Sequence, residues 1–146
     1  MRRSVPFAVA TALGFGSAAN GMFMLISPAN WHFAVPGATI TGLFDQHFVR
    51  NIGLIFMLVA IAMLTGFARP MARVPLWSAG ALWLSAHALL HLCEVAVGIC
   101  GTGALARDFS AVTLSAMFAT ALVLWAWFDA RCGKPQLVSV EDAHAA

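Results

Sequence analysis

Four long apolar stretches, separated by shorter segments that hold most of the charged residues, set the pattern of this chain. They run over Pro6–Ile26, Phe48–Phe67, Leu76–Cys100 and Phe109–Phe128. A helix that crosses a bilayer needs about 20 apolar residues, which each stretch supplies. The pattern therefore predicts an all-α protein. Residues 1–132 are expected to form one transmembrane four-helix bundle, and residues 133–146 a flexible cytoplasmic tail.

The basic residues predict how the bundle is oriented. Six of the eight fall on one side of the predicted helices, and only Arg50 and Arg107 fall on the other. The larger group is expected in the cytoplasm, together with both termini; it comprises Arg2, Arg3, Arg69, Arg73, Arg131 and Lys134. The start, Met-Arg-Arg-Ser before an apolar run and Ser-Ala-Ala, also fits a cleaved secretory signal. Cleavage would leave the other three helices in the same orientation.

Composition agrees with a membrane protein. The chain is 61% hydrophobic and 10% charged, whereas soluble domains carry roughly 25% charged residues. The lipid bilayer is therefore an expected partner. The net charge of +2, with no basic block, argues against nucleic acid. Small residues in the first stretch, at Gly14/Ala18 and Ser17/Gly21, permit close helix packing, which is compatible with a homo-oligomer or a larger membrane complex.

The third stretch holds the most informative residues of the chain. His87, His91 and Glu94 are spaced i, i+4 and i+7, so they share one face of a helix. An ionisable side chain inside a membrane span is costly and indicates a functional site. We therefore expect all three side chains to point into the bundle.

Polar residues of the other helices reach a similar depth. With a rise of about 1.5 Å per residue, Asn20, Arg50 and Asn51 fall in the same outer half of the bilayer as the histidines. These three are predicted to bind a ligand, in a pocket that opens outward. Arg50 and Glu94 have opposite charges at one depth and are expected to form a pair.

Several chemistries fit this set. His87, His91, Glu94 and His47 offer nitrogen and oxygen ligands that suit Zn, Fe or Cu. A b-type haem would use His47 with one of the other two histidines. A quinone or lipid-like head could hydrogen-bond His91, Arg50 and Glu94, and histidine also suits proton transfer. Alternatively, the polar groups only satisfy one another in a non-catalytic accessory or structural subunit. No enzyme signature decides whether a reaction is catalysed.

The long segment between the first two stretches is expected to face outward. Pro36 and Gly37 suit the centre of a type II turn, and His32 is expected at the membrane surface. The segment is either a lid over the pocket or a partly buried connector.

One resemblance adds to this interpretation. The segment His47-Phe-Val-Arg-Asn-Ile-Gly53, with Pro36-Gly37 before it and the His87, His91 and Glu94 pattern after it, resembles small uncharacterised bacterial four-span membrane proteins that are broadly DoxX-like. The resemblance implies a four-helix bundle in the bacterial inner membrane. It implies no particular reaction, because none is established for these proteins. Members often have Asp where this chain has Asn51, so a charge at that position is not transferred.

Overall fold

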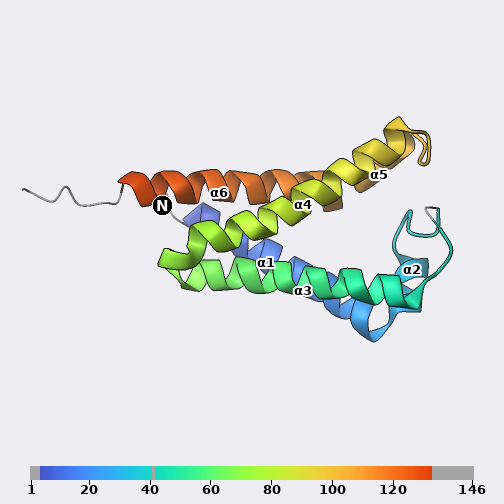
Figure 1. Ribbon diagram of the computed structural model, residues 1–146, viewed down its shortest axis with the longest axis horizontal. Coiled ribbons are helices and arrows are strands. Elements are labelled where there is room, and N and C mark those ends of the chain that lie inside the picture. The colour runs from blue at the N-terminus through green and yellow to red at the C-terminus, as the bar shows by residue number, and fades with distance from the viewer. Residues whose placement is uncertain (1–3, 41, 133–146) are drawn as a thin grey trace, which may run out of the picture.

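The computed structural model describes residues 4–40 and 42–132, and every regular element in those ranges is a helix (Figure 1). The elements are α1 Ser4–Ile26, α2 Pro28–Ala34, α3 Gln46–Ala68, the 3-10 helix η1 Pro70–Ala72, α4 Arg73–Ala96, α5 Gly103–Asp108, the π-helix η2 Phe109–Thr113 and α6 Leu114–Cys132. The expected flexible tail, residues 133–146, lies outside the described residues.

Four helical segments are long and apolar enough to cross a membrane. They span Ser4–Ile26, Gln46–Ala68, Pro70–Ala96 and Gly103–Cys132. The prediction of an all-α, four-helix membrane protein is therefore confirmed. The third spanning helix, α4, ends at Ala96, four residues before the predicted end at Cys100. It ends there because the chain turns at Gly98, whose φ of +80° lies in the left-handed region.

The segment between α1 and α3 contains a helix that the sequence analysis did not predict. α2 begins at Pro28, where proline is tolerated because the first helical N–H has no partner within the helix. The predicted turn follows it: the Ala38 amide donates to the Val35 carbonyl over 3.2 Å, and Gly37 has a φ of +91°. His32 is buried, with 7% of its surface exposed, beside Phe33 and Phe44. The His32 side chain therefore packs against protein and is not open to its surroundings.

The long helices associate in two pairs. α1 packs mainly against α3, and α4 mainly against α6, while α3 and α4 join the pairs (Figure 1). Small residues bring α1 and α3 close together, because a Cβ on Gly21 would lie 2.7 Å from the Gly53 carbonyl oxygen. The small-residue stripe of α1 is thus used for packing within the chain.

The bundle has two unlike ends. At one, which we call the terminal end, α1 begins, α6 ends and η1 joins α3 to α4 (Figure 1). The other, called the loop end, carries α2 and α5. Toward the loop end α3 and α4 diverge, as Figure 1 shows, so the two pairs contact each other mainly near the terminal end.

A buried arginine joins all four long helices at the terminal end. The Arg73 Nε donates to the Gly66 carbonyl over 3.1 Å, and an Nη lies 4.0 Å from an Asp129 carboxylate oxygen. The guanidinium also lies 4.9–5.8 Å from three aromatic ring centroids, those of Phe7, Trp77 and Trp125. Arg73, Phe7, Trp77, Trp125 and Asp129 are called the Arg73 cluster below.

Trp77, which is fully buried, connects this cluster to α3. Its indole N–H donates to the Met63 carbonyl over 3.0 Å. The indole fits because residue 66 is glycine: a Cβ there would lie 2.5 Å from Trp77 Nε1 and 2.6 Å from Cδ1.

We therefore predict that Gly66→Ala destabilises the bundle. The added methyl group displaces a packed indole, and such overpacking costs about 1–3 kcal/mol. Gly16→Ala is the matched control, because nothing lies within 4 Å of its Cβ and alanine favours a helix. Unfolding curves in detergent micelles measure both. Equal stability of the two variants would contradict the packing described here.

Arg73→Lys is expected to lower the free energy of unfolding by about 2 kcal/mol, because the ammonium lacks the Nε donor that bonds the Gly66 carbonyl and the planar group that lies over the rings. Arg131→Lys is the control. Arg131 also lies over a ring, that of Trp127 at 3.4 Å, but it is exposed, and we expect less than about 0.5 kcal/mol. The same unfolding curves test the pair, and similar losses would show that burial of Arg73 is unimportant.

Candidate functional site

Four polar side chains gather at the loop end, in the angle between α4 and α5. The rings of His87 and His91 meet edge to face, with centroids 4.8 Å apart. The His91 Nδ1 lies 3.2 Å from an Asp108 carboxylate oxygen. Arg107 binds the same carboxylate with both Nε, at 2.6 Å, and Nη2, at 2.9 Å. These residues, His87, His91, Arg107 and Asp108, are called the loop-end cluster.

The local fold explains why these residues meet. The two histidines are one turn apart on α4, so their rings lie on one face. After the turn at Gly98, α5 runs back and brings Asp108 to His91. The π-helix η2 starts directly after Asp108, and π-helical turns are frequent at functional sites.

The loop-end cluster is partly open. The side chains are 30% exposed for His91, 26% for Arg107 and 14% for Asp108. Both carboxylate oxygens of Asp108 are used within the cluster. The histidines and the arginine therefore provide its accessible hydrogen-bonding groups.

The type II turn after α2 reaches across to this cluster. Gly37 lies against the guanidinium of Arg107, since a Cβ at position 37 would lie 2.6 Å from Nη2 and 2.7 Å from Nε. The segment between α1 and α3 thus contacts the α4–α6 pair at the end where the two pairs diverge. The positive φ favours glycine at this position, and a side chain there would require the guanidinium of Arg107 to move.

Aromatic rings border the inner side of the cluster. The Trp83 indole stacks on the His87 ring with centroids 5.8 Å apart, and the Phe56 ring meets His87 edge-on at 6.0 Å. The Trp83 Nε1 is buried, and no hydrogen-bond partner for it occurs in residues 4–40 and 42–132. Trp83 also lines a pocket of about 160 Å³ between α3 and α4, whose other walls include Val59 and Gly80.

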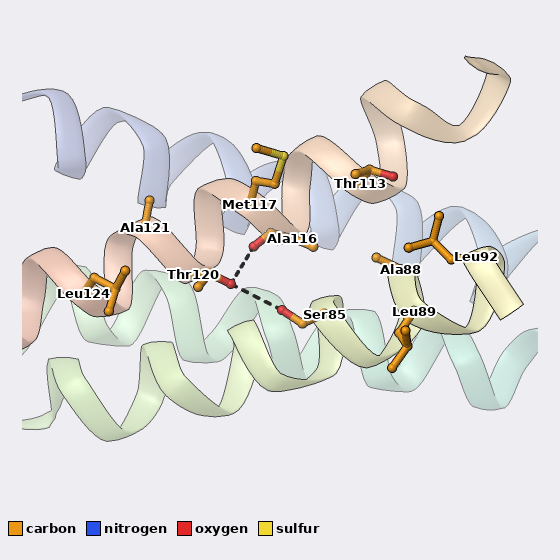
Figure 2. A pocket seen from close by; sticks show the side chains of 10 residues that line it. All are labelled: Ser85, Ala88, Leu89, Leu92, Thr113, Ala116, Met117, Thr120, Ala121 and Leu124. Carbon is orange, nitrogen blue, oxygen red and sulfur yellow. Dashed lines mark hydrogen bonds between the residues drawn. The ribbon is translucent and has the colours of Figure 1, made fainter. Parts of the chain in front are cut away.

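A second hollow lies on the opposite flank of α4. It is an apolar groove of about 510 Å³ between α4 and α6, lined in part by Ala88, Thr113 and Met117 (Figure 2). Its two central hydroxyls, Ser85 and Thr120, are 3.3 Å apart and bond each other, as Figure 2 shows. The groove has no charged lining residue, so we assign the chemistry to the loop-end cluster.

The structure brings together only part of the predicted site. His87 and His91 meet, but Glu94 makes no hydrogen bond or ion pair through its side chain with any described residue. His47 is exposed on α3. In the described part of the chain, no group of three or more His, Cys, Asp and Glu side chains is placed to hold a metal ion. The metal site expected from His87, His91, Glu94 and His47 is therefore not assembled.

The predicted ligand-binding residues face outward or bond other partners. Arg50 and Asn51 are exposed, and Arg50 donates through Nε to the Leu25 carbonyl over 3.3 Å instead of pairing with Glu94. Asn20 accepts a hydrogen bond of 2.9 Å from the Trp31 indole. The reason is geometric: similar depth did not bring Arg50 and Glu94 together, because the loop ends of α3 and α4 diverge (Figure 1).

Three residues of the site, Trp83, Arg107 and Asp108, are not among the residues predicted from the sequence. Asp108 precedes the fourth apolar stretch at a depth comparable to that of the histidines, which is a signal for its place here. Arg107 enters the sequence-based prediction only through its charge, as an orientation signal. Trp83 lies one turn before His87, on the same face, and that spacing was the available signal.

No protein-family model, no curated protein and no solved structure matches this chain.

Gly37→Ala tests the contact between the turn and the cluster. The new methyl group forces Arg107 or the turn to move and also meets a positive φ, so we expect a loss of about 1–3 kcal/mol in stability. Gly98→Ala is the control: its φ is also positive, at +80°, but nothing lies within 4 Å of its Cβ. Thermal unfolding should give the larger loss for Gly37→Ala. A larger loss for Gly98→Ala would contradict a stabilising contact between Gly37 and Arg107.

Proposed function

We propose that this protein binds a small amphipathic, redox-active ligand of the quinone class, with its head in the α3–α4 pocket beside Trp83. The Trp83 indole would border a planar ring there, and His87, on which the indole stacks, lies beyond it. His91 and Arg107 supply hydrogen-bond donors beyond them. Apolar walls with a few polar groups are the usual composition of a small-molecule site.

The indole N–H of Trp83 is the observation that carries this proposal. A buried donor without an acceptor costs about 1–3 kcal/mol, and buried polar groups are nearly always paired. Trp83 contacts both the α3–α4 pocket and His87. A ligand carbonyl next to the indole would satisfy the donor, which accounts for an arrangement that otherwise only costs stability.

The size of the pocket limits what it holds. At about 160 Å³ it is smaller than the roughly 300–1,000 Å³ of sites that enclose a drug-sized molecule. It therefore suits one ring or carbonyl end, while a tail would extend along the helices into lipid. A quinone is preferred to a metal ion because the described side chains offer no ligand set.

We further propose a location in the bacterial inner membrane, which the resemblance to DoxX-like proteins implies, with both termini in the cytoplasm. The excess of arginine and lysine beside the terminal end supports this orientation. The loop-end cluster would then open on the outer side.

A structural role is the second candidate. It is favoured by one observation: His91, Asp108 and Arg107 already satisfy one another. Interhelical hydrogen bonds of about 0.6–2 kcal/mol each would help hold α4 to α5. In that case the protein is an accessory subunit that needs no ligand.

Trp83→Phe separates the two candidates, because it keeps the ring and removes the N–H. We expect a short-tailed benzoquinone to bind about fivefold more weakly to this variant, through loss of one hydrogen bond. Stability without ligand should fall by no more than about 1–2 kcal/mol, because removal of an unsatisfied donor offsets part of the packing that the smaller phenyl ring loses. Trp127→Phe, an exposed tryptophan at the terminal end, is the matched control and should bind as the wild type does. Calorimetric titration and thermal unfolding in detergent provide the readouts.

A wild type that binds no benzoquinone would overturn the ligand proposal and favour the structural role. Equal weakening in both tryptophan variants would show that the quinone partitions into the micelle without a site.

A further inference from the structure

At the loop end of α3, three polar residues face the outside of the bundle. His47, Arg50 and Asn51 are all exposed, although they belong to a helix that crosses a membrane. Below them on the same face are three exposed apolar side chains, Leu54, Leu58 and Ile61, with 53–64% of their surfaces accessible. These six residues are called the α3 outer face.

Arg50 has an unusual position on this face. It is the fifth residue of α3, so it lies about 6 Å along the axis from the helix start. Its Nε bonds the Leu25 carbonyl, which fixes the side chain beside the end of α1. Within the described residues it forms no ion pair, so the Nη atoms have no protein anion. A charge at this depth requires a partner, because solvation by hydrocarbon is poor.

Asp45 is the acidic residue nearest in sequence. It caps α3, with a carboxylate oxygen accepting from the Phe48 amide over 3.0 Å. This bond holds the carboxylate at the helix start, and Asp45 makes no ion pair with Arg50. His47 and Asn51 add hydrogen-bonding groups on the same side as the arginine, three residues before it and one after it.

The order of groups along the face matches one kind of partner. The spacing of the six residues keeps them on one side of the helix. A cation and two hydrogen-bonding side chains lie at the membrane-surface end, and branched apolar side chains follow toward the membrane interior. A phospholipid has the same order, with its phosphate at the surface and its acyl chains below.

We infer that the α3 outer face is a specific site for an anionic phospholipid. The lipid phosphate binds the Nη atoms of Arg50, assisted by His47 and Asn51, and one acyl chain lies along Leu54, Leu58 and Ile61. Guanidinium and phosphate pair well because two parallel N–H groups meet two oxygens. The apolar half of the face commits the site to a lipid and not to free phosphate. The polar residues of this site are separate from the loop-end cluster, although Leu58 also lines the α3–α4 pocket proposed for the quinone.

The test is native mass spectrometry of the full chain, reconstituted in phosphatidylglycerol and phosphatidylcholine and then released in mild detergent. The wild type should retain phosphatidylglycerol selectively. Arg50→Gln should lower its retention about fivefold, the effect of one arginine at a membrane surface. Arg69→Gln is the matched control: it removes the same charge from an exposed residue after the other end of α3 and should keep wild-type retention.

Unchanged retention in Arg50→Gln, or equal losses in the two variants, would overturn the site. If Arg50→Gln fails to fold, Asn51→Leu decides the matter, because Asn51 is exposed and its replacement leaves the core intact. It should retain less phosphatidylglycerol than the wild type, and wild-type retention in a folded Asn51→Leu protein would also reject the site.

Discussion

The buried guanidinium of Arg73 is the constraint on which this bundle depends. A charge inside a membrane protein must find partners, and Arg73 finds them on every long helix: a ring of α1, a carbonyl of α3, the indoles of α4 and α6, and the carboxylate of Asp129. Each partner fixes the distance of one helix from the others. Because Trp77 bonds Met63 and packs on Gly66, the same end also sets the contact between α3 and α4.

Because the helices are held together at the terminal end, their tilt there sets how far apart the two helix pairs lie at the loop end. The two helix pairs are held together near Arg73, and α4 leaves α3 at an angle toward the loop end (Figure 1). The polar residues of the two pairs therefore do not converge in one chamber. Those of α4 and α5 form the loop-end cluster, whereas those of α3 face outward. At the loop end, the turn after α2 contacts the other helix pair through Gly37, which lies against the guanidinium of Arg107.

Hydropathy was sufficient to predict the membrane-spanning helices, because each must be long and apolar to cross a bilayer. It was not sufficient for the site. Depth follows from the rise per residue, but the direction of a side chain depends on how a helix is rotated and tilted against its neighbours. Arg50 and Glu94 share a depth and still do not meet. Arg73 was assigned to a cytoplasmic loop because charge is read there as an orientation signal, whereas its burial depends on three aromatic rings from different helices.

Two tryptophans of α4 differ in how their indole N–H groups are paired. Trp77 and Trp83 lie on one helix, and the indole of each contacts another aromatic ring. The N–H of Trp77 bonds the Met63 carbonyl, so that residue contributes to stability directly. The N–H of Trp83 has no acceptor among the described residues. A buried donor without an acceptor costs stability. This unpaired donor is the observation on which the quinone proposal rests.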